Sequence, residues 1–481
     1  MTLFTLESIQ FHVLPMRTRF PFKYGIASLS SLPHLFVTVK LVVNGKPAEG
    51  LASEGLAPKW FTKDPHTTPE QDVAEMLSVV QNAARIGREA GRNAVTFFQW
   101  WKSLYDEQAL WAKHREMPML LANLGTSLIE RAVLDGFCKA LCLPLHRLLK
   151  TNDLAIDLGA VRGELSGLNV AAVIAPEPVM KVHVRHTIGL ADPLSAADVP
   201  DAERVNDGLP YSLDENIRAY GLSYFKIKVS GKAEADIVRL RAIAAVLDAC
   251  CAEPYHSTLD GNEQFDDMAA FQDFYRVLAS DPALKRLFAS IILIEQPIYR
   301  AHALDEVVGE GLRTWSDGLP MIIDESDGSL DDLPRALSLG YQGTSHKNCK
   351  GVVKGLANSA LLKRRDLSHL SGEDLASVGP VAMLQDLCVA SLLGITHVER
   401  NGHHYFRGLS MYDEKVHADV LRAHEGFYRR HENGFPTLDI QAGVLDVSSL
   451  HAAPFACGAK LDMAAYEPLN AWIKRGGITE L

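Results

Sequence analysis

Charged side chains at the ends of short apolar runs are the part of this sequence that could do chemistry. The runs YFKIKV, STLD, IILIE, MIID and YQGTSHK each contain or end in a lysine or a carboxylate. If these runs are the strands of one closed parallel sheet, their carboxyl ends meet at one mouth, so we expect the charged groups to converge on a single cavity. The residues concerned are Lys226, Lys228, Asp260, Glu295, Asp324, Glu325 and Lys347, with Asn262 close behind Asp260.

The four carboxylates of this series predict a divalent cation. Carboxylates that converge in a confined space repel one another unless a cation is present. Hard oxygen ligands suit Mg²⁺, with water or substrate oxygen completing the octahedron. Zinc is the weaker choice, because these strand ends offer no thiol and no histidine other than His346.

The lysines of the series predict a base. Lys226 and Lys228 are two residues apart, so their side chains point to the same face of a strand. Two adjacent ammonium groups disfavour each other's charge, and a nearby metal ion acts in the same direction, so we expect the pKa of at least one lysine to be lowered. Such a lysine can accept a proton near neutral pH. A single residue of this kind is usually structural; the ordered series on successive units carries the functional interpretation.

The elements that would position these residues alternate between strand and helix. From about Val182 to Tyr405, short apolar runs alternate with helix-like stretches, which is typical of a parallel sheet. About eight units fit a (β/α)8 barrel, and we find neither GxGxxG nor GxxxxGK[ST], the phosphate loops typical of an open sheet. The predicted fold class is therefore α/β, a modified TIM barrel with an α+β capping domain.

The rest of the chain supplies that cap. We expect strands over 36–43 and 48–54 joined at Asn44-Gly45, then helical stretches over 70–88 and 120–149. The predicted boundaries are 1–150 for the N-terminal cap, 151–181 for an insertion, 182–435 for the barrel and 436–481 for a segment that returns to the cap.

Composition narrows the class of protein. The chain has 481 residues and a formal net charge of −11, which argues against nucleic acid or an anionic membrane as the main partner. We find no signal peptide and no apolar run long enough for a membrane span. The odd number of cysteines, seven, with no CxxC pair, favours free, buried thiols and a cytoplasmic location.

The charged series resembles the enolase superfamily, specifically its muconate-lactonizing subgroup within the mandelate racemase/muconate lactonizing enzyme family. Lys226-Ile227-Lys228 matches the K-x-K of the second barrel strand, and Lys347 with Gly351 matches the lysine and glycine of the sixth. Asp260, Glu295 and Asp324 match the metal carboxylates of strands three, four and five. The stretches 125–149, 20–25 (FPFKYG) and 438–458 resemble the helix before the barrel, the loop that closes over substrate and the C-terminal segment.

The resemblance implies a site around one Mg²⁺ ion held by Asp260, Glu295 and Asp324, with Asn262 supporting Asp260. A small carboxylate substrate would bind the ion, and Lys226 would polarise it. Lys228 and Lys347 would lie on opposite faces of the α-carbon, with Glu325 orienting or balancing Lys347. Loops 20–28 and 51–61 would close the pocket, through Phe22, Tyr24 and Trp60. The family also leaves a homo-oligomer open.

Several reactions fit this arrangement. Opposed lysines permit racemisation or epimerisation, cycloisomerisation, or syn elimination by a lyase. An acid-sugar dehydratase of the same fold, a Schiff-base aldolase using Lys347 and a non-catalytic barrel are the alternatives. The stretch His397–Tyr405 has no Asp-x-Asp, the pattern with which dipeptide epimerases hold the substrate amino group, so that class is disfavoured. His183/His186 and His403-His404 suggest a second metal site, but surface or loop histidines are the favoured interpretation.

Overall fold

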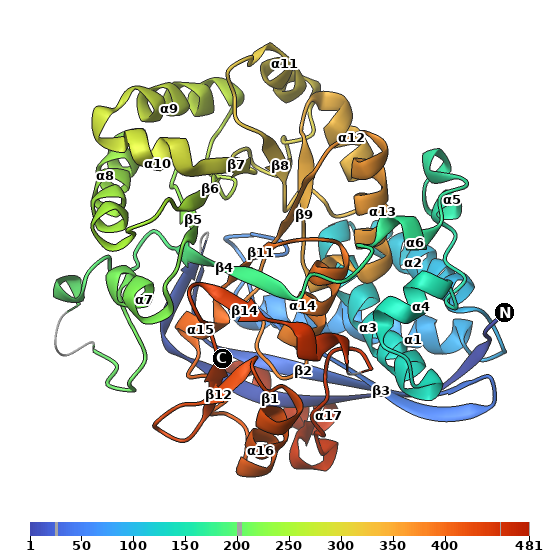
Figure 1. The fold of residues 1–481 in the computed structure, drawn as a ribbon. Coiled ribbons are helices and arrows are strands. Elements are labelled where there is room, and N and C mark those ends of the chain that lie inside the picture. Colours follow the sequence, from blue (N-terminus) through green and yellow to red (C-terminus); the bar gives the residue numbers. More distant parts are fainter. Residues whose placement is uncertain (25–26, 200–203, 453, 481) are drawn as a thin grey trace.

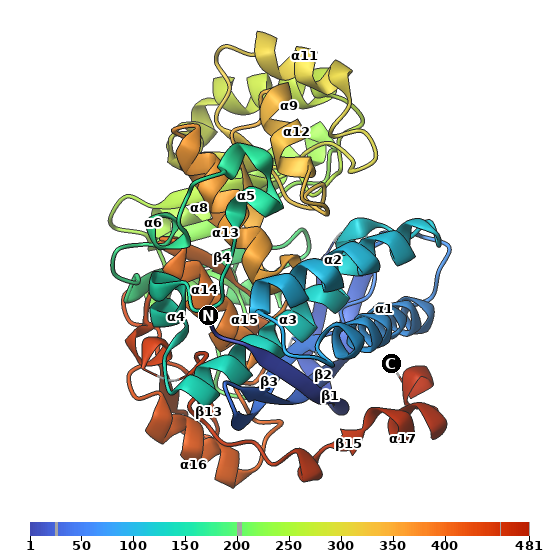
Figure 2. The same cartoon turned by 90° about the vertical axis from the view of Figure 1, so that its right-hand side faces the viewer.

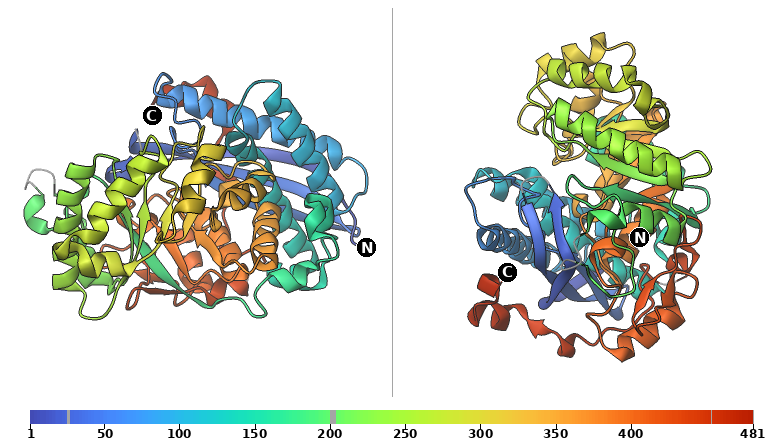
Figure 3. Two further views of the ribbon diagram at one scale, coloured as in Figure 1. Left: turned by 90° about the horizontal axis from the view of Figure 1, so that it is seen from above. Right: turned by 90° about the vertical axis from the view of Figure 1, so that its left-hand side faces the viewer.

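The structure is a computed structural model that describes residues 1–24, 27–199, 204–452 and 454–480. It consists of a parallel barrel and a cap that lies beside the barrel (Figure 1). Figure 2 shows the cap, coloured blue to cyan, as a sheet with helices packed on one face. Both views of Figure 3 place this cap against one end of the barrel.

The cap is built on an antiparallel sheet in the order β15-β1-β2-β3. Strand β1 (Phe4–Tyr24) pairs with β2 (Ala27–Val43), which pairs with β3 (Lys46–Gly55). The predicted turn is confirmed: Asn44 and Gly45 have φ values of 48° and 79°, the left-handed conformation of a two-residue hairpin turn. Residues 20–24, predicted as part of a loop, instead extend β1, with Phe22 opposite Leu29.

Three helices cover this sheet: α1 (Pro69–Ala90), α2 (Phe97–Lys113) and α3 (Met119–Leu141). Helix α1 starts where predicted, because Thr68 and Gln71 form a reciprocal capping box and Pro69 occupies the first turn. The predicted helical stretch 120–149 is interrupted: Cys142 is left-handed (φ 54°) and Pro144 precedes α4 (Leu145–Thr151).

The barrel is a ring of eight parallel strands. Its first strand, β4 (Lys181–Ile188), pairs with its last, β11 (His397–Arg400), with Val184 opposite Val398, which closes the ring. Between them, in spatial as well as chain order, lie β5 (Tyr224–Lys228), β6 (His256–Asp260), β7 (Ile291–Glu295), β8 (Met321–Ile323), β9 (Gly343–His346) and β10 (His369–Gly372). The predicted (β/α)8 architecture is confirmed.

Helices follow the strands and surround the ring. In chain order they are α7 (Leu213–Tyr220), α8 (Ala233–Cys250), α9 (Met268–Ser280), α10 (Lys285–Ser290), α11 (Glu306–Thr314), α12 (Asp332–Leu339), α13 (Val352–Arg364) and α14 (Ala382–Leu392). After β11 come α15 (Gly402–Tyr405), α16 (Glu414–Ala423) and a hairpin of β12 (Tyr428–Arg430) and β13 (Pro436–Leu438).

Two other segments join barrel and cap. The stretch after α4 folds as α5 (Leu158–Val161) and α6 (Val170–Val173), and its Arg162 donates to Leu330 O (2.7 Å) and Asn358 Oδ1 (2.6 Å) on the barrel. Near the C-terminus, β14 (Val444–Asp446) pairs with β4, β15 (Glu467–Pro468) pairs with β1, and α17 (Leu469–Lys474) lies at the edge of the cap (Figure 2).

The described residues contain neither a membrane-spanning helix nor a disulfide bond. None of their helices combines the length and the apolar character that a bilayer crossing requires. All seven cysteines lie in the described ranges and are free thiols, as predicted. They are not all buried, because Cys142 is exposed and Cys250 and Cys457 are partly exposed.

Candidate active site

The ends of neighbouring barrel strands bring the predicted residues together. Lys228 on β5 is the register partner of Asp260 on β6, and Asp260 is the partner of Glu295 on β7. The three therefore form one row across adjacent strands, because parallel strands in this register end at the same level. All three are buried, and Lys228 Nζ donates to Asp260 Oδ2 at 3.0 Å.

Lys226 lies one layer deeper, surrounded by four carboxylates. Its Nζ is 2.7 Å from Glu295 Oε2 and from Glu373 Oε2, 3.1 Å from Asp260 Oδ2 and 3.2 Å from Glu399 Oε2. Burial disfavours the ammonium form, but the carboxylates outweigh burial and raise the pKa of Lys226 well above its ordinary value. Lys226 is therefore a fixed cation at the centre of the barrel mouth.

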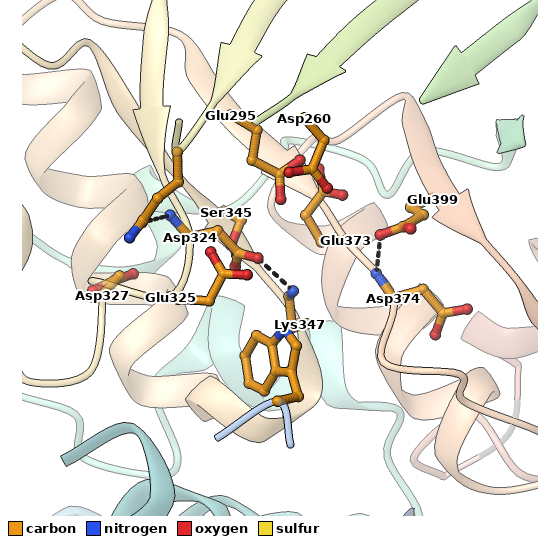
Figure 4. A network of polar contacts seen from close by, with 12 residues as sticks. Asp260, Glu295, Asp324, Glu325, Asp327, Ser345, Lys347, Glu373, Asp374 and Glu399 are labelled. Atoms are coloured by element: carbon orange, nitrogen blue, oxygen red, sulfur yellow. Dashed lines mark hydrogen bonds and ion pairs between the residues drawn. The ribbon is translucent and has the colours of Figure 1, made fainter. Parts of the chain in front are cut away.

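Asp324, after β8, and Lys347, after the neighbouring strand β9, form a second ion pair at the mouth of the barrel (Figure 4). Lys347 Nζ donates to Asp324 Oδ2 at 2.8 Å, and the other Asp324 oxygen accepts from Ser345 Oγ and lies 3.1 Å from Lys350 Nζ. Burial opposes ionisation of Asp324, but Lys347 and Lys350 outweigh burial and hold the pKa of Asp324 well below its usual range. Both oxygens of this carboxylate are thus engaged by cations or a hydroxyl.

The protein's own residues raise the pKa of Lys228 rather than lower it. Burial and Lys226 do act to lower it, but Asp260 outweighs them, helped by Glu399 and Glu295, so the pKa of Lys228 is raised above the ordinary lysine value. The prediction considered the neighbouring lysine and a metal ion; in this arrangement the carboxylate opposite Lys228 dominates.

Glu325 and Asn262 lie on the wall of the same cavity. Asn262 Nδ2 donates to Glu325 Oε1 at 3.3 Å, and the backbone N–H of Asn262 donates to Asp260 Oδ1 at 2.7 Å. Burial, with the negative charges of Asp324 and Glu263, raises the pKa of Glu325 to about 7. Lys347 forms its ion pair with Asp324. That Glu325 orients Lys347 or balances its charge stays a prediction.

The donor types at these strand ends fit a hard divalent cation. Asp260, Glu295 and Asp324 offer only oxygen, and Glu295 Oε2 is buried and accepts no hydrogen bond of suitable geometry, although Lys226 Nζ lies near it. Burial and the neighbouring Asp260 and Glu373 raise the pKa of Glu295 well above its usual range, so a further positive charge would stabilise its carboxylate. Among the described residues, however, no three His, Cys, Asp or Glu side chains are grouped closely enough to hold an ion. Ammonium groups stand between these carboxylates.

The cap supplies the opposite wall of the cavity. Phe22 and Trp60, both predicted, line it, and the Trp60 ring lies over Lys347 with 4.4 Å between Nζ and the ring centroid. Phe22 stacks on Tyr405 with centroids 4.0 Å apart. Tyr24 ends β1, but its side chain lies outside the described part of the structure.

At the ends of the last two barrel strands, four polar residues of the site were not predicted: Glu373 and Asp374 after β10, and Glu399 and Asn401 at the end of β11. Glu373 and Glu399 hold Lys226, and Asp374 N donates to Glu399 Oε2 at 3.0 Å (Figure 4). The signal was present, since LSGED and HVERN also end apolar runs in charged residues. Extending the strand-end rule to the last two strands would have found them.

The histidines considered for a second metal site are not surface residues. His186, His403 and His404 are buried, and His186 Nδ1 lies 3.1 Å from His403 Nε2. Burial, first of all, lowers the pKa of each of the three. His183 instead lies at the opposite end of β4, where its ring contacts Tyr224. The favoured interpretation as surface or loop residues is therefore wrong for the three buried histidines.

Comparison with known proteins finds similarity at the level of structure. No family model matches the chain, and no curated protein matches it. Among solved structures, a mandelate racemase/muconate lactonizing protein from Herpetosiphon aurantiacus matches with a TM-score of 0.60 at 17% identity, over 95% of this chain and 99% of that one.

Two other solved structures have named activities. The muconate lactonizing enzyme from Pseudomonas fluorescens, complexed with muconolactone, matches with a TM-score of 0.57 at 19% identity, over 96% of this chain and 99% of that one. The L-Ala-D/L-Glu epimerase from Bacillus subtilis matches with a TM-score of 0.55 at 16% identity, over 95% of this chain and 100% of that one. The chain has the fold of the enolase superfamily, in the capped-barrel form shared with mandelate racemase/muconate lactonizing proteins.

Proposed function

We propose that this protein is an enzyme that removes the α-proton of a small carboxylate substrate, by way of an enediolate, with Lys228 and Lys347 as its acid–base residues. One observation carries the proposal. The two lysines come from β5 and from the end of β9, four strands apart in a ring of eight, and both line one cavity. A substrate α-carbon between them would present one face to each lysine.

The surrounding residues suit the charges of this reaction. Lys226 is a buried cation held in place by carboxylates, and it would attract the substrate carboxylate and the negative charge that develops when the proton leaves. Phe22 and Trp60 on the cap would exclude water above the reacting carbon. Glu325 and Asn262 would contact substrate from the side of β6 and β8.

We also propose that Asp260, Glu295 and Asp324 hold one Mg²⁺ ion, which would take the place of the ammonium groups that lie between these carboxylates. The ion would neutralise the substrate carboxylate and, by engaging the counter-ions of Lys228 and Lys347, would lower the pKa of both lysines. The product class stays open among racemisation or epimerisation, cycloisomerisation and syn elimination, because all of them begin with the same proton transfer. An acid-sugar dehydratase would begin in the same way.

The Schiff-base alternative is disfavoured by the surroundings of Lys347. An imine-forming lysine must be a neutral amine, and an aldolase of this type has no metal ion that would draw Asp324 away from Lys347. The Asp324 carboxylate and the Trp60 ring over Lys347 would then keep it in its ammonium form. The pKa of Lys347 is raised by Asp324, which outweighs burial.

The direct test is α-proton exchange in D₂O over a panel of small carboxylates, with Mg²⁺ and, in parallel, with EDTA. We expect deuterium to enter the α-position of at least one compound class, and EDTA to stop it. Covalent trapping of substrate on Lys347 by borohydride, with activity retained in EDTA, would instead establish the aldolase.

A further inference from the structure

A loop of the cap reaches over the barrel mouth and carries Trp60 and Phe61. Only 8% of Trp60 and 2% of Phe61 is exposed, and the two rings meet edge-on with centroids 4.9 Å apart. Because the Trp60 ring lies over Lys347 Nζ, the position of this loop determines both the cover of the cavity and the environment of one proposed acid–base residue. The contacts that hold the loop are therefore of functional interest.

The main contact comes from Arg300, which follows β7 on the barrel. Its guanidinium donates to the backbone oxygens of the cap loop, from Nη1 to Phe61 O at 2.7 Å and from Nη2 to Trp60 O at 3.0 Å. Two backbone carbonyls in a row are thus held by one planar group whose geometry is rigid. Arg300 therefore holds Trp60 through its backbone and not through its ring.

Glu263, after β6, holds Arg300 in turn. Arg300 Nε and Nη2 donate to the two Glu263 oxygens, each at 2.7 Å, and the backbone N–H of Arg300 donates to the same carboxylate at 2.9 Å. Lys63, on the cap loop, donates to Glu263 Oε2 at 2.9 Å and to Asn262 O at 2.7 Å. The Glu263 side chain is 0% exposed, so its charge is compensated wholly by these two cations.

The backbone at this junction is strained. Lys63, Asn262 and Glu263 have φ values of 54°, 43° and 63°, and Lys59 on the same loop has 66°. Non-glycine residues rarely adopt this left-handed conformation, and they persist in it where surrounding contacts hold them. Strained residues on both sides of one contact indicate that the contact itself maintains the two loops.

We infer that Glu263, Arg300 and Lys63 form a clamp that seats Trp60 over Lys347, which makes them positioning residues of the active site. Glu263 is the hub: without its charge, two cations would face each other at the junction and the cap loop would move away. The part of this inference that concerns turnover rests on the proposed function, whereas the part that concerns the position of Trp60 does not.

The test therefore begins with a measurement that needs no substrate. The chain has six tryptophans, so protein labelled with 5-fluorotryptophan should give six ¹⁹F resonances, and Trp60→Phe identifies the one from Trp60. Glu263→Gln removes the hub, and Arg300→Lys keeps the charge but loses the two-pronged contact. We expect both variants to shift or broaden the Trp60 resonance and to leave in place that of Trp472, which is buried on α17.

Arg241→Lys is the matched control. Arg241 lies 2.7 Å from Asp281 in an ion pair of its own, and it does not line the cavity. The control should leave all six resonances unchanged. A Trp60 resonance that stays at its wild-type position in Arg300→Lys would overturn the clamp, and this variant keeps the test valid if Glu263→Gln fails to fold.

The role in catalysis is read from kinetics on an accepted substrate. We expect KM to rise about tenfold or more in Arg300→Lys, because the cover of the substrate is displaced, while the Kd for Mg²⁺ stays within about twofold. A displaced Trp60 resonance with unchanged KM and kcat would overturn the catalytic role of the clamp. Absence of α-proton exchange in the wild-type protein would overturn the proposed function and, with it, that catalytic role, while the ¹⁹F test of the Trp60 seat still stands.

Discussion

Lys228 and Lys347 are the residues on which the proposed chemistry depends most directly. If the enzyme is a racemase or epimerase, each lysine serves one enantiomer. Lys228→Ala should then abolish α-proton exchange from one hand of the substrate and Lys347→Ala from the other, and each should reduce net turnover by at least about a hundredfold. Mass spectrometry of each enantiomer incubated separately in D₂O measures this.

For a cycloisomerase or lyase, the same two variants should differ in kind. One should lose all exchange, and the other should retain exchange but form no product. Full activity in the double variant Lys228→Ala, Lys347→Ala would refute the mechanism, because no other pair of lysines in the charged series could lie on both sides of an α-carbon.

Substitution of Asp260 tests the proposed Mg²⁺ site. The Asp260 carboxylate contacts both Lys226 and Lys228, so Asp260→Asn removes a candidate ligand and the counter-ion of two lysines at once. We expect the variant to be inactive and its Mg²⁺ affinity, measured by titration calorimetry, to fall by more than about tenfold. Near-identical thermal unfolding would show that the fold persists. A wild-type Mg²⁺ affinity in this variant would place the ion elsewhere.

Close packing of elements positions the cap. Strand β3 crosses helix α3 at Gly50, where an added Cβ would lie 1.9 Å from Ala132 O and 2.6 Å from Gly136 N. Both are backbone atoms, which cannot move aside as the end of a side chain can. A side chain at position 50 would therefore push the sheet away from the helix.

Gly50→Ala should accordingly reduce the free energy of unfolding by about 2 kcal/mol or more. Urea denaturation followed by circular dichroism measures the loss. Gly163→Ala is the control, because nothing lies within 4 Å of its added Cβ, and it should unfold like the wild type. Equal stability of the two variants would mean that the contact between β3 and α3 is looser than the structure shows.

At the scale of the whole molecule, cap and barrel share a buried polar interface. Glu130 on α3 accepts the first backbone N–H groups of α13, from Val352 at 2.9 Å and Val353 at 2.8 Å. His34 on β2 lies 2.9 Å from Ser53 Oγ, which accepts from the backbone N–H of Ala382 at the start of α14. The cap and the barrel are therefore joined by hydrogen bonds of titratable side chains, the Glu130 carboxyl and, through Ser53, the His34 imidazole.

His34 makes that interface sensitive to acid. Burial, with the nearby Arg131, lowers its pKa from 6.5 to about 3. Between these values the unfolded chain binds a proton at His34 and the folded protein does not, so this group's contribution to stability is lost as pH falls below about 6.5. Each further unit by which the pH falls reduces the free energy of unfolding by up to about 1.4 kcal/mol.

His34→Gln should remove this part of the pH dependence. Between pH 7.5 and pH 5.0, the unfolding free energy of the wild type should fall by about 2 kcal/mol more than that of the variant. Chemical denaturation at both pH values gives the two differences. Parallel behaviour of both proteins would show that His34 is not kept neutral in the folded state.

Much of the barrel and part of the site could be read from local patterns. Strand runs and the residues that end them are adjacent in sequence, so the series from Lys226 to Lys347 and the order of the strands followed without knowledge of any contact. The Asn44-Gly45 turn and the Thr68 cap are equally local, because each depends on the conformational preferences of two to four neighbouring residues.

Only the tertiary structure determined which charge meets which. Lys226 is held by Glu373 and Glu399, 147 and 173 residues away, and Asp260 raises the pKa of Lys228 where the adjacent lysine alone would lower it. The clamp of Glu263, Arg300 and Lys63 likewise joins three loops that the sequence keeps far apart. Electrostatic energy depends on distance and burial in the folded state, and neither follows from spacing along the chain.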